Sequence, residues 1–154
     1  MINHQLFRIL LFLALSLILL QLVSGVWLFS EKFGLTPSSL IAYFAGDEQK
    51  FISAKSVEGV LETAVPHFLA ISTTIFVSAH FLLFTQIISE HKKYLLIASI
   101  FIAALVDIFS SFGILYGYHL FAYAKLIGFY TFELLMALLL FILFKAALHS
   151  PSSH

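Results

Sequence analysis

The sequence predicts an all-α integral membrane protein: a four-helix bundle with a structured loop between its first two helices. Of its 154 residues, 61% are apolar and only 10% are charged, whereas a soluble domain carries about 25% charged residues. Four segments are long enough to cross the hydrocarbon core of a bilayer, which takes roughly 20 mainly apolar residues. We therefore expect residues 1–154 to form a single transmembrane domain.

The amino-acid composition also excludes several classes of function. The chain has no cysteine, which excludes disulfides, iron–sulfur clusters and thiolate metal sites. Eight basic and eight acidic side chains give a formal net charge of zero, so nothing indicates a nucleic-acid partner. No nucleophile–base or phosphate-loop motif typical of soluble enzymes is present. We assign no catalytic residue.

The first expected helix covers about residues 6–29, an apolar run that is too long for the core of a secretion signal and is expected to be retained. The loop that follows contains a short helix at about residues 37–45. Thr36 can cap it, Pro37 suits its first position and Gly46 suits its end. Its apolar and aromatic side is suited to the membrane interface.

Three more spanning helices are expected at about residues 64–88, 94–118 and 120–148. Ser56 can cap a helix that runs through Glu62 into the second span and bends at Pro66. The connections between the last three spans are short, so these spans must lie antiparallel as neighbours. Small residues four apart, Gly113 with Gly117 and Ala124 with Gly128, favour close contact between the last two spans.

Basic residues beside the helix ends favour cytoplasmic termini in a bacterial inner membrane. In that orientation the basic residues divide equally: Arg8, Lys92, Lys93 and Lys145 lie inside, and Lys32, Lys50, Lys55 and Lys125 lie outside. The inner charges stand next to helix ends in short segments, so we favour this orientation.

Ionisable side chains at bilayer depth usually face the interior of a bundle and mark a site. With a rise of ~1.5 Å per residue, His67 lies ~6 Å below the outer end of its helix, and His119 lies at the outer turn. These two histidines, with Glu62 and Lys125, form a predicted outer cluster.

A second predicted cluster lies near the midplane. Asp107 is ~16 Å deep and Glu133 is ~18 Å deep, at about the level of Ser16 and of Thr73 or Thr74. Two carboxyl groups so placed could share a proton in a relay. The alternative, which we favour, is that each is protonated and hydrogen-bonds a neighbouring Ser or Thr.

Two histidines on different helices at one depth could hold a haem b or a metal ion, because imidazole is the commonest metal ligand and helix bundles are a standard place for haem. We expect His67 and His119 to be these ligands. Alternatively, they are interfacial histidines bonded to water or to Glu62. His80 lies ~25 Å deep and is turned about 140° from His67. A second haem at His80 would need a partner chain, and a structural histidine on the face of Thr73 is an equal alternative.

The stretch from Lys55 to Leu69, with Glu62, Pro66 and His67, and the later run Ala79-His80-Phe81-Leu82 resemble a group of uncharacterised bacterial four-helix inner-membrane proteins. The two histidines on one helix are also similar to those of haem b-binding four-helix membrane cytochromes. The first resemblance implies architecture and a bacterial setting, and no activity.

Three functions remain open. The leading hypothesis is a small haem b-binding protein that acts as an electron-transfer or quinone-interacting subunit of a respiratory assembly. The second is a non-catalytic accessory subunit of a larger membrane complex, with lipid and other membrane subunits as partners. The third is a proton or cation pathway through Asp107, Glu133 and His80, which would require a homo-oligomer because four helices make a narrow pore.

Overall fold

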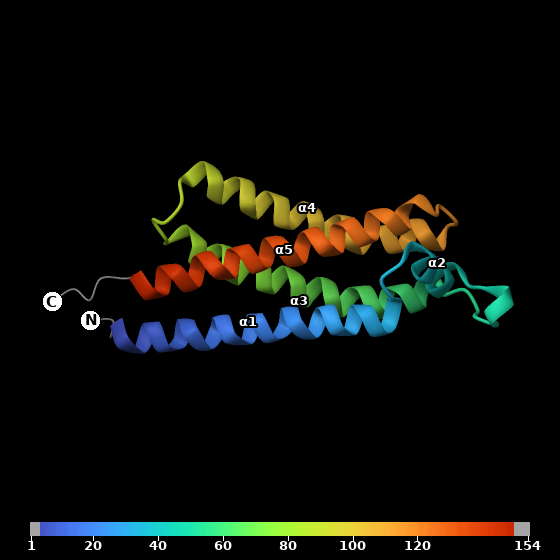
Figure 1. The fold of residues 1–154 in the computed structure, drawn as a ribbon, viewed down its shortest axis with the longest axis horizontal. Helices are drawn as coiled ribbons and strands as arrows, with labels where there is room; N and C mark the ends of the chain where they lie inside the picture. The colour runs from blue at the N-terminus through green and yellow to red at the C-terminus, as the bar shows by residue number, and fades with distance from the viewer. Residues whose placement is uncertain (1–3, 150–154) are drawn as a thin grey trace.

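The computed structural model describes residues 4–149, which form long helices that run side by side (Figure 1). The elements in chain order are α1 (His4–Phe33), α2 (Pro37–Ala45), the short 3-10 helix η1 (Glu48–Lys50), α3 (Val57–Leu83), α4 (Glu90–Leu115) and α5 (Leu120–His149). The four long helices are each long and apolar enough to span a membrane. The expected all-α membrane bundle is confirmed.

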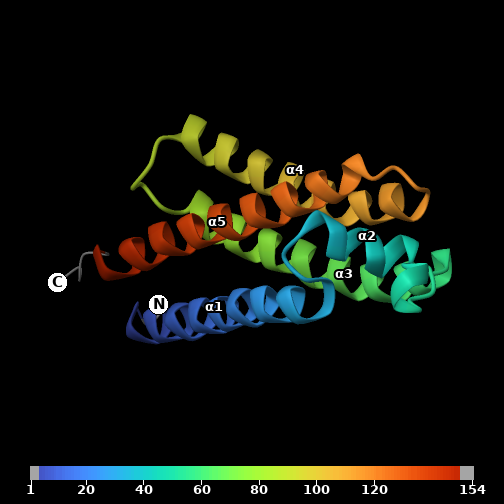
Figure 2. The ribbon, with the colours of Figure 1, turned by 45° about the vertical axis from the view of Figure 1, so that its right-hand side comes forward.

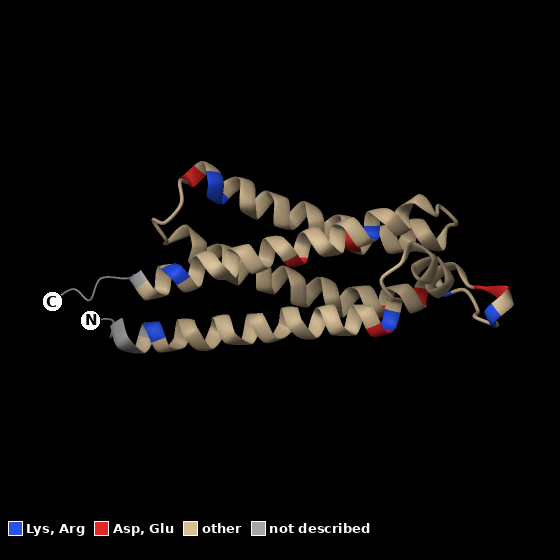
Figure 3. Cartoon of the chain, in the orientation of Figure 1, with Lys and Arg blue, Asp and Glu red and all other residues tan. Residues whose placement is uncertain are grey.

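The bundle has two distinct ends. We call the end that carries α2, η1 and the α4–α5 turn the loop end, and the end where α1 begins and α5 finishes the terminal end (Figures 1 and 2). Lys, Arg, Asp and Glu gather mainly at these two ends, and few lie between them (Figure 3). Large apolar side chains are exposed along all four spans, as expected of helices in contact with lipid.

The expected helix in the long loop is present and folded against the bundle. Thr36 caps α2: its hydroxyl accepts a hydrogen bond from the Ser39 amide, and Ser39 completes a reciprocal capping box. Leu40 and Phe44 are buried in a cluster with residues of α1, α3, α4 and α5. Burial of these side chains holds the loop over one end of the bundle.

The second span differs at both ends from its expected range. The helix capped by Ser56 does run through Glu62, so α3 begins at Val57 rather than near residue 64. It ends at Leu83, before the expected end at residue 88. Here the buried Lys93 ammonium donates to the Leu83 carbonyl over 3.2 Å and to Glu90 Oε1 over 2.7 Å. A cation at the last carbonyls of a helix satisfies their unpaired acceptors.

The last two spans pack closely, as their small residues predict. A β-carbon at Gly128 of α5 would lie 2.8 Å from the Asp107 backbone nitrogen of α4. A β-carbon at Gly113 would overlap the Phe121 ring. Gly117 has a different role, because its φ of 86° forms the turn between the two helices. Close approach at Gly128 brings Asp107 to the surface of α5.

Candidate functional site: a polar and aromatic cavity between α1 and α3

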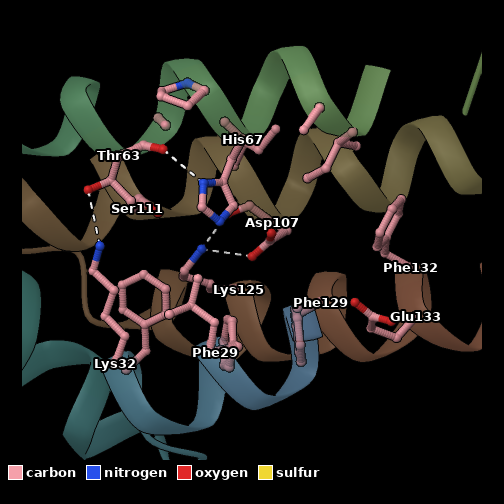
Figure 4. A pocket seen from close by; sticks show the side chains of 18 of the residues that line it. Phe29, Lys32, Thr63, His67, Asp107, Ser111, Lys125, Phe129, Phe132 and Glu133 are labelled. Carbon is pink, nitrogen blue, oxygen red and sulfur yellow. Dashed lines mark hydrogen bonds and ion pairs between the residues drawn. The ribbon is translucent and has the colours of Figure 1, made fainter. Parts of the chain in front are cut away.

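A cavity of about 530 Å³ lies between α1 and α3, with α4 and α5 contributing further walls. Its lining mixes aromatic rings with polar side chains at membrane depth (Figure 4). A cavity with apolar walls and a few convergent polar groups is the usual form of a small-molecule site. The ionisable residues that line it are Lys32, His67, Asp107, Lys125 and Glu133.

The best-defined polar contact in the cavity is an ion pair between Asp107 and Lys125. Lys125 Nζ lies 2.7 Å from Asp107 Oδ1 and donates to the Asp107 carbonyl over 3.1 Å. The Lys125 side chain is only 6% exposed and that of Asp107 is 16% exposed. Removal of one partner from a buried pair leaves an uncompensated charge. Substitution of either residue alone is therefore expected to destabilise the fold.

Three phenylalanine rings surround the same ammonium group. Lys125 Nζ lies 5.7 Å from the centre of the Phe29 ring, 5.5 Å from that of Phe33 and 5.9 Å from that of Phe44. Cation–π attraction strengthens when the cation is removed from water. Phe29 also stacks on Phe129 with 3.8 Å between ring centres, so a flat aromatic wall continues from the ion pair along the cavity.

His67 faces the cavity from α3. Its Nδ1 donates to the Thr63 carbonyl, four residues earlier, over 3.1 Å. Figure 4 shows its ring directed toward Asp107 and Lys125. Since Nδ1 is occupied, Nε2 is the ring nitrogen left to meet a ligand.

Glu133 lines the cavity from α5, two turns beyond Lys125 on the same face of the helix. Its carboxyl is half-buried, and a β-carbon at Gly25 of α1 would lie 3.5 Å from Oε1. Within residues 4–149 the carboxyl has no hydrogen-bond partner. It is therefore the polar group in this cavity most open to a ligand.

The structure divides the predicted outer cluster. His67 and Lys125 both line the cavity. His119 is exposed in the α4–α5 turn and is absent from the residues that line the cavity. Glu62 is also exposed and outside this lining. Among the described residues, no group of three or more His, Asp or Glu side chains is placed to hold a metal ion.

The structure also rearranges the predicted midplane cluster. Asp107 is paired with Lys125 rather than with a Ser or Thr hydroxyl. Thr74 is buried and donates to Gln21 Oε1 of α1 over 2.9 Å, whereas Thr73 is exposed. Ser16 is exposed and bonds the Phe12 carbonyl of its own helix.

His80 lies outside this cavity. It is exposed, its ring contacts those of Phe76 and Phe84, and it lines a smaller cavity of about 280 Å³ with residues of α3 and α4. The structure therefore places His67 and His80 in different environments.

Sequence reasoning missed the contribution of α1. Gln21, Ser24 and Gly25 line the cavity, and their spacing puts them on one face of a helix that is otherwise almost wholly apolar. A polar or small stripe on such a helix is the signal that could have identified this wall.

The fold and the cavity define a class: a multi-pass helical membrane protein with a polar, aromatic cavity inside its spans. Residues 34–154 match the model of a family described as a transmembrane helical domain, and the chain belongs to this family. No curated protein and no solved structure matches the chain.

Proposed function

We propose that the protein is a quinone-interacting membrane protein, with the ring of the ligand in the cavity between α1 and α3. The observation that carries the proposal is the Asp107–Lys125 pair within an aromatic cavity. An ammonium group has three N–H donors, and Lys125 directs two of them to Asp107. The third is available to a carbonyl oxygen of a bound ring.

Charge favours a neutral ligand over an anion or a cation. The cavity is lined by two lysines, Lys32 and Lys125, and by two acids, Asp107 and Glu133. Their formal charges cancel when both acids are ionised and His67 is neutral. A quinone is neutral, flat and carries carbonyl acceptors, so it matches the charge, the stacked Phe29 and Phe129 rings and the free donor of Lys125.

The reduced form of such a ligand is also accommodated. His67 donates through Nδ1 to Thr63, so in the neutral ring Nε2 is an acceptor. A quinol hydroxyl could donate a hydrogen bond to this atom. The Glu133 carboxyl could hydrogen-bond a second oxygen of the ligand. The site therefore contains groups suited to both oxidation states. A role in a respiratory assembly of the bacterial inner membrane follows as part of the same proposal.

Haem b is a second candidate, supported by one observation. A histidine whose Nδ1 is held by a carbonyl and whose Nε2 faces a cavity has the arrangement typical of metal-binding histidines. His67 meets this description, and His119 does not line the same cavity. A haem here would therefore take His67 as its protein ligand.

Calorimetric titration of the purified protein in detergent with a decyl-tailed benzoquinone tests the first proposal. The double variant Lys125→Met/Asp107→Asn removes the donor without leaving an unpaired charge. It should bind about tenfold more weakly or worse, because a hydrogen bond to a charged group contributes about 1.5–3 kcal/mol. Lys145→Met, in the same helix but outside the cavity, is the matched control and should bind normally.

Two outcomes would redirect the assignment. Equal quinone affinity of the double variant and the wild type would show that the ion pair does not contribute to quinone binding. A Soret band in purified wild-type protein, lost in His67→Ala and kept in His80→Ala, would establish haem instead. Absence of both quinone binding and a chromophore in folded protein would favour the accessory-subunit hypothesis.

A further inference from the structure

We infer that the ligand enters the cavity sideways from the bilayer, through a window between α1 and α3, and that its apolar tail lies in this window. The inference rests on the proposed function, because it concerns access to the same site. It narrows the ligand to a tailed molecule that is dissolved in the membrane.

Two hydrogen bonds between α1 and α3 frame the window. Gln21 Oε1 accepts from Thr74 Oγ1 over 2.9 Å, and Lys32 Nζ donates to Thr63 Oγ1 over 3.4 Å. The two α1 residues are eleven apart and so are the two α3 residues. Eleven residues make slightly more than three helical turns and ~16 Å of rise, so both bonds join the same pair of faces.

Small side chains keep the space between these two bonds open. Ser24 and Gly25 line it from α1, and Ala64 and Ala70 line it from α3. Because the helices are antiparallel and Gln21 pairs with Thr74, Gly25 of α1 lies opposite Ala70 of α3. In this part of the bundle α1 packs mainly on α5, through the stacked Phe29 and Phe129 rings. Side-chain hydrogen bonds therefore join α1 and α3 at the frame, and the cavity lies between the helices within it.

The rim of the window is exposed and lies within two membrane-spanning helices. Leu28 is 50% exposed, and Ser24, His67 and Ala70 are also exposed. All four residues lie inside spans that are long and apolar enough to cross the bilayer. A tail that leaves the cavity here would pass directly into the hydrocarbon region.

Access from the loop end is less favourable. Phe33 and Phe44 line the cavity on that side, and both belong to the aromatic and aliphatic cluster beneath α2. Phe44 is 4% exposed. A ligand that came from water would have to displace this cluster, whereas the rim toward the lipid includes the small side chains of Ser24 and Ala70.

The absence of native cysteine makes a direct test simple. Ser24→Cys/Ala70→Cys is reconstituted in phosphatidylcholine nanodiscs and bridged across the window with a reducible bis-methanethiosulfonate reagent. The association rate of the decyl-tailed benzoquinone is then measured before bridging, after bridging and after reduction. Phe12→Cys/Phe144→Cys, which bridges α1 to α5 outside the cavity, controls for tethering of α1.

Bridging the window should slow association at least tenfold, and reduction should restore the rate of the same sample. Bridging Phe12→Cys/Phe144→Cys should leave the rate unchanged. A second variant does not depend on a cross-link: Ala70→Trp should slow association, whereas Ala98→Trp, on an exposed face of α4, should not.

Two failures can be told apart. If wild-type protein binds the quinone saturably and neither the bridge nor Ala70→Trp changes the rate, the window is not the route, and the proposed binding site stands. If wild-type protein shows no saturable binding, the proposed function fails and the window fails with it.

Discussion

At the residue scale, the Asp107–Lys125 pair organises the cavity. The sequence predicts that both residues are ionisable groups inside the membrane. It places them in different clusters, because the depth of each side chain is estimated from the position of its backbone. A lysine stem is long and flexible, so its ammonium group can reach well beyond its own helical turn. Pairing between the clusters therefore could not be predicted from depth alone.

The first prediction concerns this pair. Lys125→Met should lower the free energy of unfolding by about 3 kcal/mol, because it leaves the Asp107 carboxylate buried and unpaired. Lys125→Met/Asp107→Asn should recover most of that loss, since both charges are removed. Chemical unfolding in detergent measures both variants. Equal stability of the single and double variants would show that the pair is not coupled.

The histidines show a different limit of prediction. The close-contact motif at Gly113 places α4 against α5, as the sequence predicts. The same turn leaves His119 exposed, because the positive φ of Gly117 reverses the chain. Sequence spacing identifies which helix ends meet, whereas the direction of a side chain in a turn depends on individual dihedral angles.

At the element scale, packing of α4 on α5 depends on the absence of a side chain at Gly128. A β-carbon there would lie 2.8 Å from a backbone nitrogen, which cannot move as a flexible side chain can. Gly128→Ala should therefore lower the melting temperature, by separating two helices.

The matched control for this prediction is Gly59→Ala in the first turn of α3. A β-carbon at Gly59 would lie 3.5 Å from Ser56 Oγ, an ordinary contact. Alanine favours a helix over glycine by about 1 kcal/mol, so this variant should be neutral or slightly stabilising. A thermal shift assay compares the two, and a Gly128→Ala protein as stable as Gly59→Ala would contradict close packing.

Prediction of the loop helix succeeded because its signals are local. Capping by Thr36 and proline at the first position act within one turn, so neighbouring sequence suffices to identify them. Thr36→Ala should destabilise α2 by about 1 kcal/mol. Hydrogen exchange should then be faster at the α2 amides and unchanged in α5, whereas equal protection in both proteins would contradict a capping role.

At the scale of the whole molecule, the four spans are an even number of crossings. The start of α1 and the end of α5 therefore lie at the same end of the bundle (Figure 1). Arg8, Lys92, Lys93 and Lys145 belong to this terminal end. We predict that it faces the cytoplasm. A reporter that is active only in the periplasm should give no signal when fused after His154, and strong activity would reverse the orientation.

The class of helical membrane protein could be predicted, because hydropathy and length are properties of single continuous segments. The cavity could not be predicted, because it depends on which helices pack together: α1 packs on α5 rather than on α3, while α4 and α5 stay in contact. No pattern within one segment reports a gap between two. The stripe of Gln21, Ser24 and Gly25 marks one wall of the cavity, but the facing wall, with Ala70, lies in another segment.

The proposed function requires that a quinone ring occupies the cavity between α1 and α3. Its most direct test is photolabelling of the protein in membranes with an azido-benzoquinone, followed by mass spectrometry of the labelled peptides. We predict labels within residues 21–33 and 63–71, strongly reduced by excess unlabelled quinone and in Lys125→Met/Asp107→Asn. Labels spread over the lipid-facing surfaces of all four spans, with no competition by unlabelled quinone, would contradict the claim.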